Sequence, residues 1–168
     1  MRPEDQRKAG VHYAVVPRTL VFLTRADQVL LLRGAPGKPL WAGKLNGLGG
    51  HLEPGETPLQ SARREVLEEA GLQVDTLILR AVVHITMPVP PGIILFVFVG
   101  EVSRSELVAS AEGEPLWVQR SALSTLPLVE DLPHLLPRVL DPGPLTFAHY
   151  CFTDSGLEIS FDPQPGVG

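Results

Sequence analysis

The sequence predicts an α+β or mixed α/β fold, in which strands dominate and two helices are laid against them. Three observations predict this class. Apolar, β-branched segments of strand length recur through most of the 168 residues. One segment near the middle has the caps and the apolar period of a helix, and a second amphipathic segment follows later. The apolar fraction of 44% is enough for a core, and no repeat or long linker divides the chain.

The expected single domain spans residues 11–162. Residues 1–10 are polar, and residues 163–168 are rich in Pro and Gly, so both are expected to be flexible tails. Residues 14–25 and 28–34 are apolar and β-branched and predict two successive strands. Pro17 interrupts the first of them, which predicts an edge or a bulge there, because proline cannot donate to a strand ladder.

The middle of the chain contains the clearest helix. A loop rich in Gly and Pro and a few short strand fragments precede it. Thr57 is a good N-cap, Pro58 suits the first helical position, and Gln60 completes a capping box. Gly71 is a natural stop. The residues expected to face the core follow the helical period and are Leu59, Ala62, Val66 and Ala70.

The second half of the chain predicts more strands and one further helix. The apolar positions of 132–140 follow a helical period, and Pro137 is expected to kink that helix. The predicted strands are 74–87, 93–102, 116–118, and a closing hairpin formed by 146–152 and 157–161.

Composition excludes several classes of function. The net charge is −5 and no basic run occurs, so a nucleic-acid duplex is not an expected partner. The single cysteine, Cys151, cannot form an internal disulfide, which fits a cytoplasmic protein, and its apolar neighbours favour a small buried hydrophobe over a nucleophile. The charged N-terminus does not resemble a secretory signal, and the longest apolar run, at 93–99, is too short to span a membrane.

Three glutamates crowd one arc of the predicted helix. Glu65, Glu68 and Glu69 cover roughly a quarter of its circumference, beside the apolar arc. Like charges at this spacing cost about 0.2–0.5 kcal/mol per pair. Arg64 can partner Glu68, whereas Glu65 and Glu69 have no basic residue at helical spacing on their own face. One interpretation is a solvated acidic surface; the other is a site for Mg²⁺ or Mn²⁺, which prefer oxygen ligands.

The segment from Gly50 to Leu72 resembles the Nudix box, G-x5-E-x7-R-E-U-x-E-E-x-G-U, where U is aliphatic. The matching positions are Gly50, Glu56, Arg64, Glu65, Val66, Glu68, Glu69, Gly71 and Leu72. The resemblance implies the Nudix fold, a mixed β-sheet sandwiched between the box helix and a second helix. It also implies Mg²⁺- or Mn²⁺-dependent hydrolysis of a nucleoside diphosphate linked to another moiety.

The resemblance also implies roles for individual residues. Glu65, Glu68 and Glu69 are similar to the metal ligands of the family, and a carbonyl of Gly49 or Gly50 is expected to join them. Glu65 or Glu69 could take a proton from a metal-bound water.

Two further box residues and one acid outside the box are carried over in the same way. Glu56 and Arg64 look like the structural ion pair of the family, and Gly71 ends the helix. Glu112 falls where many members place one more acidic ligand, although a solvated loop acid is an equal alternative.

The flanking sequence is similar to the Nudix subgroup that hydrolyses oxidised purine nucleoside triphosphates, such as 8-oxo-dGTP. Asn46 matches the residue that contacts the base there, with a turn residue as the alternative. Glu130 and Asp131 match an acidic pair that reads the base edge, and a helix N-cap is the alternative for Asp131. Arg33 is either a phosphate contact or an ordinary strand-end arginine.

One departure from the subgroup concerns base stacking. Leu128 and Val129 precede Glu130 where the relatives have a stacking tryptophan, so base stacking either comes from Trp41 or Trp117 or is absent.

Three hypotheses follow from these features. The first is a pyrophosphohydrolase that converts oxidised or non-standard purine nucleoside triphosphates to monophosphate and pyrophosphate. The second keeps the chemistry but acts on ADP-ribose, a dinucleoside polyphosphate or another diphosphate. The third is a nucleotide-sensing domain without catalysis. A homodimer is possible in each case, because many Nudix proteins dimerise.

Overall fold

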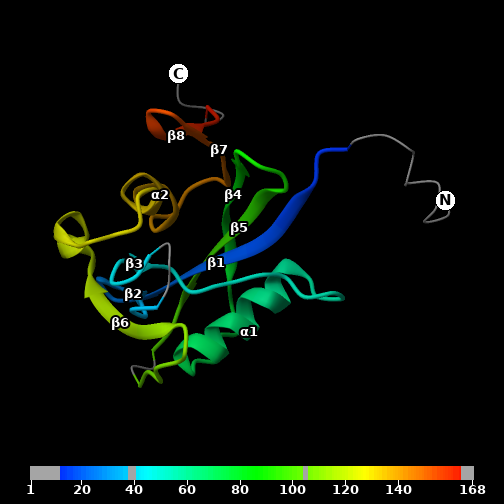
Figure 1. Cartoon of the computed structure of the whole chain (residues 1–168). Helices are drawn as coiled ribbons and strands as arrows, with labels where there is room; N and C mark the ends of the chain where they lie inside the picture. Colours follow the sequence, from blue (N-terminus) through cyan, green and yellow to red (C-terminus); the bar gives the residue numbers. More distant parts are fainter. Residues whose placement is uncertain (1–11, 38–40, 104–105, 164–168) are drawn as a thin grey trace.

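The computed structural model describes residues 12–37, 41–103 and 106–163, so the expected tail at 1–10 and all of the expected tail at 163–168 except residue 163 lie outside the described residues. The described chain forms an eight-stranded sheet, two α-helices and a short 3-10 helix (Figure 1). In chain order the elements are β1 (Val15–Arg25), β2 (Gln28–Gly34), β3 (Leu45–Asn46), α1 (Pro58–Ala70), β4 (Ile78–Thr86), β5 (Gly92–Glu101), β6 (Gly113–Gln119), η2 (Arg120–Thr125), α2 (Leu132–Val139), β7 (Thr146–Thr153) and β8 (Gly156–Phe161).

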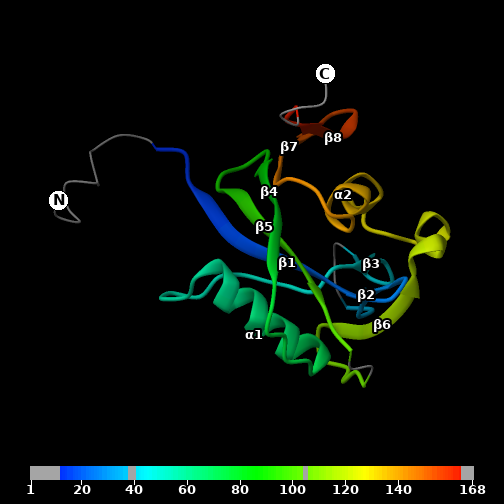
Figure 2. The same ribbon diagram turned by 180° about the vertical axis from the view of Figure 1, so that it is seen from behind.

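The sheet is mixed, as predicted. Its strand order is β3-β2-β1-β5-β4-β7-β8, and β6 pairs with β2. β1 runs parallel to β5 and β4 parallel to β7, while the other neighbours are antiparallel. Figures 1 and 2 show α1 and α2 on opposite sides of the central strands. The mixed α/β prediction is therefore confirmed.

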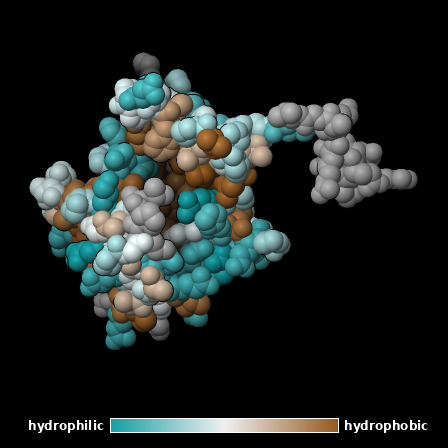
Figure 3. Space-filling model, viewed as in Figure 1, coloured by the Kyte–Doolittle hydropathy of each residue, from teal (hydrophilic) through white to brown (hydrophobic). Residues whose placement is uncertain are grey.

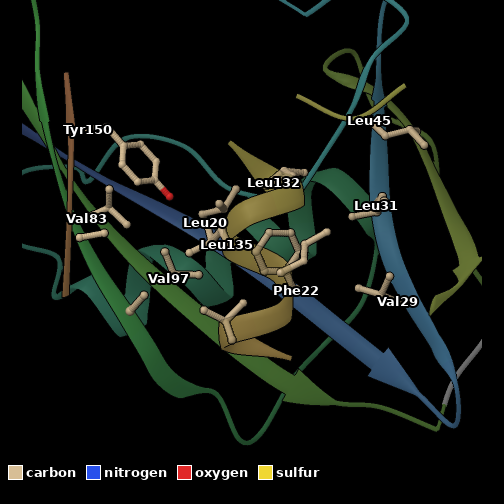
Figure 4. Close-up of a cluster of buried hydrophobic side chains, with 14 of the residues drawn as sticks. Leu20, Phe22, Val29, Leu31, Leu45, Val83, Val97, Leu132, Leu135 and Tyr150 are labelled. Atoms are coloured by element: carbon tan, nitrogen blue, oxygen red, sulfur yellow. The ribbon is translucent and has the colours of Figure 1, made fainter. Parts of the chain in front are cut away.

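Two cores lie on the two faces of the central strands. Leu20 and Phe22 of β1 pack under α2, together with alternate residues of β2 (Figure 4). Val21 and Leu23 point to the other face and pack against α1. Because side chains alternate along a strand and both faces are covered, β1 and β2 appear in the sequence as continuous apolar runs.

The predicted bulge at Pro17 is absent, because the pairing of β1 with β5 is unbroken from Val15 to Thr24. The predicted edge is present locally, because β1 pairs with β2 only from Leu23 to Arg25, and at Pro17 its other side faces the loop at 48–52. The N–H groups of Thr19 and Val21 donate to the loop at 48–50 and not to β5. Pro17 is two residues before Thr19, so the side of its backbone that lacks an N–H donor faces the same loop. A donor is not required there, because the loop does not form a continuous strand ladder with β1.

Other elements match the predictions or extend them. The closing hairpin is present as β7 and β8, and Pro137 lies inside α2 as expected. The strand expected at 116–118 extends over all of β6 because it pairs with the full length of β2. The 3-10 helix η2 was not predicted. None of the helices in the described residues has the length and hydropathy needed to cross a membrane.

Candidate active site

Helix α1 begins and ends at the predicted residues. The hydroxyl of Thr57 accepts a hydrogen bond from the Gln60 N–H at 3.3 Å, and the Gln60 side chain accepts one from the Thr57 N–H at 2.8 Å. Gly71 adopts a left-handed conformation with φ 71° and donates its N–H to the Leu67 carbonyl. Only glycine takes this conformation at little cost. The helix is therefore fixed at both ends, and its acidic arc has a defined direction.

The acidic arc is less separate from the core than the sequence suggests. Ala62, Val66 and Ala70 are buried as predicted, but the Glu69 residue is also buried, with 4% of its surface exposed. A Glu69 carboxylate oxygen accepts a hydrogen bond from the Gly49 N–H at 2.7 Å. A buried carboxylate requires such a donor. Glu69 thus ties α1 to the glycine loop at 47–50.

Arg64 connects the acids of the box. Its Nε lies 2.8 Å from the carboxylate of Glu56, which is the ion pair implied by the resemblance. Its Nη1 lies 2.9 Å from Glu65 and 3.2 Å from Glu68. Glu65 has no basic residue at helical spacing, as expected, but it has a basic partner all the same, because the Arg64 guanidinium contacts its own sequence neighbour. The repulsion among the acids is offset by one guanidinium that they share.

The pKa values of two acids respond to this arrangement. Hydrogen bonds from Arg64 lower the pKa of Glu56 to about 2. Burial raises the pKa of Glu65, and Arg64 opposes that rise. Two carboxylates that share a cation thus differ in the direction of their pKa shift, because the hydrogen bonds from Arg64 dominate at Glu56 and burial dominates at Glu65.

Two adjacent glycines shape the loop in front of the acids. A Cβ at Gly50 would overlap the carboxylate of Glu65, so only glycine leaves room for that side chain. Gly49 has φ 135°, and a Cβ there would overlap the backbone carbonyl of Thr19. The Gly50 carbonyl accepts a hydrogen bond from the Thr19 N–H at 2.8 Å. Of the two carbonyls offered by the sequence, that of Gly49 is the better candidate for a metal.

The box acids face a cleft of about 610 Å³, called the acidic cleft below. Its functional lining consists of Arg18, Gly49, Gly50, Arg64, Glu65, Glu68, Glu69 and Glu112. Glu112 reaches it from the loop before β6, as the resemblance implies. The donors are carboxylate and carbonyl oxygens, the ligand set that suits Mg²⁺ or Mn²⁺.

The acidic cleft is not a preformed metal cage. Within the described ranges no three His, Cys, Asp or Glu side chains converge into a metal site. The reason is visible in the contacts, because the Arg64 guanidinium draws Glu65 and Glu68 toward itself. The donor chemistry fits a divalent cation, and each of these two carboxylates keeps a second oxygen that Arg64 Nη1 does not contact.

A second cleft of about 460 Å³, called the apolar cleft below, adjoins the first. The two share Arg18, Gly49 and Glu69. The floor is apolar, and Figure 3 shows brown atoms deep in a hollow below the β7–β8 hairpin. The residues of its lining used below are Trp41, Lys44, Asn46, Glu130, Asp131 and Tyr150. An apolar floor with a few polar groups at the rim is typical of a small-molecule site.

The three residues matched to base recognition all line the apolar cleft. Asn46 lies in β3, and its side-chain oxygen accepts the Gly47 N–H at 2.8 Å, so it shapes the turn and also faces the cleft. Glu130 is exposed and lies 3.6 Å from the Lys44 ammonium. Asp131 holds the N-cap position of α2 but makes no side-chain capping bond. Burial raises the pKa of Asp131.

The structure separates the remaining candidates. Trp41 lines the apolar cleft, whereas Trp117 lies under the Arg25 guanidinium at 4.6 Å and packs with the core beside α1. Arg33 lies outside both clefts and pairs across the sheet with Glu114 at 3.4 Å. Arg18, which lines both clefts, was missed. No signal marked it, because its position depends on the docking of the 48–52 loop against β1.

Asp131→Asn is expected to raise the Tm by a few degrees at about pH 7.5 and to leave it unchanged at about pH 3. Burial raises the folded-state pKa of Asp131, so the folded protein holds an unfavourable buried charge above that pKa. The cost vanishes below the unfolded value of about 3.9, because the carboxyl is then neutral in both states. In a domain of this size, about 1 kcal/mol moves the Tm by roughly 2–4 °C.

Thermal denaturation at both pH values tests this expectation, with Glu130→Gln as the exposed neighbouring control. An equal rise at both pH values would show that the buried charge is not the cause.

Comparison with known proteins agrees with this geometry. A model of the NUDIX domain matches residues 15–139. The oxidized purine nucleoside triphosphate hydrolase of Mus musculus is 32% identical over 146 residues, which cover 85% of this chain and 90% of that protein. The Danio rerio protein of the same name is 42% identical over 101 residues, which cover 58% of this chain and 56% of that protein.

Solved structures lead to the same family. The mutator MutT protein from Bacillus halodurans matches with a TM-score of 0.77 at 25% identity, over 90% of this chain and 100% of that chain. The fold of that protein, the domain match and the relatives all agree with the intact Nudix box that this chain carries on α1. The chain therefore belongs to the Nudix family and is a hydrolase that acts on nucleotide pyrophosphate bonds.

Proposed function

We propose that the protein hydrolyses nucleoside triphosphates to monophosphate and pyrophosphate with Mg²⁺ or Mn²⁺, favouring oxidised or non-standard purines such as 8-oxo-dGTP. The observation that carries the proposal is the pair of adjoining clefts, one lined by the box acids and one by an amide and two carboxylates over an apolar floor. The names of the two animal relatives support the same substrate class.

The acids of the first cleft suit polyphosphate chemistry only with a cation. Glu65, Glu68 and Glu69 would hold it, joined by the Gly49 carbonyl and Glu112. A divalent ion in such a site neutralises phosphate charge and lowers the pKa of a bound water. Glu65 or Glu69 would accept the proton of the attacking water at a carboxylate oxygen.

The role of Arg64 in this scheme is orientation. It binds Glu56 with two hydrogen bonds, from Nε at 2.8 Å and from Nη2 at 3.0 Å, so its own position is fixed. From there its Nη1 contacts Glu65 and Glu68 and sets their direction. Ligands held this way lose little entropy when the site assembles.

The second cleft suits a purine. The apolar floor can cover the ring faces, and Trp41 is part of the lining. Asn46 offers an amide donor and an acceptor, and Glu130 and Asp131 offer acceptors for purine N–H groups. Such pairing distinguishes purines by their hydrogen-bonding edges, because an unmatched buried polar group is costly.

A substrate panel tests the proposal. The protein with Mg²⁺ is offered 8-oxo-dGTP, dGTP, dCTP, ADP-ribose and diadenosine polyphosphates, and release of pyrophosphate and phosphate is recorded. The expected result is a kcat/KM for 8-oxo-dGTP more than about tenfold above that for dGTP. A smaller ratio removes the oxidised-purine proposal, and faster turnover of ADP-ribose or a dinucleoside polyphosphate favours those substrates. Nucleotide binding without any turnover would indicate a sensor.

Asn46→Ala is expected to lower the preference for 8-oxo-dGTP over dGTP by about tenfold, since leaving a buried polar group unpaired costs about 1–3 kcal/mol and about 1.4 kcal/mol corresponds to tenfold. The kcat on a poor substrate should change much less. Asn46→Asp is the matched control, because it retains the oxygen that accepts the Gly47 N–H but lacks the amide donor. Ratios of kcat/KM measured for both variants should fall together. Wild-type preference in Asn46→Asp would mean that Asn46 only shapes the turn.

A further inference from the structure

Arg18 differs from every other arginine that the structure describes. Each of the other seven donates a side-chain hydrogen bond or forms an ion pair. These are Arg25, Arg33, Arg63, Arg64, Arg80, Arg120 and Arg138. Within the described ranges no group forms a hydrogen bond or an ion pair with the Arg18 guanidinium. Its five N–H donors are therefore available to a ligand.

The surroundings of Arg18 make that availability unusual. The residue is partly buried in β1, and burial lowers its pKa, with the Glu65 charge opposing the effect. Its backbone forms a bridge with His51, so the side chain projects from a fixed point. A desolvated cation without a hydrogen-bonded partner is unfavourable in the free protein. An anion that fills the position would relieve this cost.

The position of Arg18 identifies which part of a nucleotide could be that anion. It lines both the acidic cleft and the apolar cleft. With the base in the apolar cleft and the bond to be broken beside the box acids, the sugar and the α-phosphate lie between them, and the α-phosphate is the anionic group of the two. Guanidinium and phosphate match as a bidentate pair.

We propose that Arg18 binds the α-phosphate of the nucleotide, an assignment that rests on the proposed function. Hydrolysis between the α- and β-phosphates leaves that phosphate on the nucleoside. Arg18 therefore also holds the monophosphate product after pyrophosphate departs. Unlike the acidic cleft, this contact needs no metal ion, because the guanidinium itself supplies the positive charge.

The test measures binding without metal. Calorimetry in EDTA compares 8-oxo-dGMP with its nucleoside, 8-oxo-2′-deoxyguanosine, on the wild-type protein, Arg18→Gln and Arg18→Lys. The wild type should bind the monophosphate about tenfold to one hundredfold tighter than the nucleoside. Arg18→Gln should bring this ratio close to one and leave the nucleoside affinity unchanged. Arg18→Lys should give an intermediate ratio, because it keeps the charge and loses the fork.

Arg33→Gln is the matched control, since it removes one arginine from the neighbouring strand outside both clefts and should leave the ratio unchanged. An undiminished ratio in Arg18→Gln, or no preference for the monophosphate in the wild type, overturns the assignment. A different result would contradict the proposed preference for oxidised purines: dGMP and deoxyguanosine would bind with the same affinity as their oxidised forms. In that case the unmodified pair gives the same phosphate ratio and still decides the role of Arg18.

Discussion

Glu68→Gln is expected to lower kcat at least about a thousandfold while the protein stays folded, because a lost metal ligand removes several kcal/mol of charge stabilisation in the transition state. The Glu68 side chain is 56% exposed, and its partner Arg64 lies 3.2 Å away at the i,i+4 spacing of a helix. Exposed pairs of this kind contribute about 0.3–0.5 kcal/mol. The fold therefore has little need of the Glu68 carboxylate, whereas the proposed metal site depends on it.

Steady-state kinetics at saturating Mg²⁺ and a thermal melt without metal measure the two effects separately. The sequence alone suggests a higher Tm for this variant without metal, from relief of repulsion. The structure instead predicts a Tm within about 2 °C of wild type, because Arg64 already offsets that repulsion. Glu114→Gln, an exposed change outside both clefts, is the control for kcat. A wild-type rate in Glu68→Gln would contradict its role as a ligand.

Alanine substitutions at two neighbouring glycines are expected to have different effects, one on activity and the other on stability. Gly50→Ala places a methyl group against the Glu65 carboxylate, the mobile end of a side chain, which can move aside. Stability should change little, but kcat should fall about one hundredfold or more, because a displaced ligand no longer fits its geometry. Gly49→Ala meets the rigid Thr19 carbonyl at φ 135° and should destabilise the fold by about 1–3 kcal/mol.

Melting curves and kcat of the two variants separate these outcomes. Gly55→Ala serves as the reference for backbone strain alone, because Gly55 has φ 90° but open space around it. The Tm of Gly49→Ala should fall further than that of Gly55→Ala, because only the Gly49 variant also overlaps the Thr19 backbone. If Gly50→Ala keeps full activity, the carboxylate of Glu65 is not required where the structure places it.

Local signals made the box helix predictable. Thr57, Pro58, Gln60 and Gly71 act within a few residues of themselves, so caps read from the sequence correspond directly to hydrogen bonds. The continuous apolar runs of β1 and β2 likewise reported burial on both faces. Helices and strands with such local signals can be predicted without knowing which segment packs against them.

Contacts between distant segments were not predictable in the same way. The burial of Glu69 and the place of Arg18 both require the 48–52 loop to dock on β1 through the Val21–Leu48 and Arg18–His51 bridges. No local rule fixes that register. The choice between Trp41 and Trp117 as the aromatic residue beside the cleft also depended on tertiary packing.

The N-cap interpretation of Asp131 shows a subtler limit. The residue does occupy the first boundary position of α2, as a capping residue would, yet its side chain makes no capping bond. The sequence defines the position but not the rotamer. An acid freed from capping can turn toward the neighbouring cleft, which it lines.

The single guanidinium shared by Glu56, Glu65 and Glu68 has a consequence for how the enzyme rests between turnovers. When free magnesium is scarce, many metalloproteins are left with clustered carboxylates whose negative charges are not neutralised. In this protein the Arg64 guanidinium supplies a positive charge beside these acids whether or not a metal ion is bound. We therefore expect the fold to persist without the proposed metal ion, and only the proposed chemistry to depend on that ion.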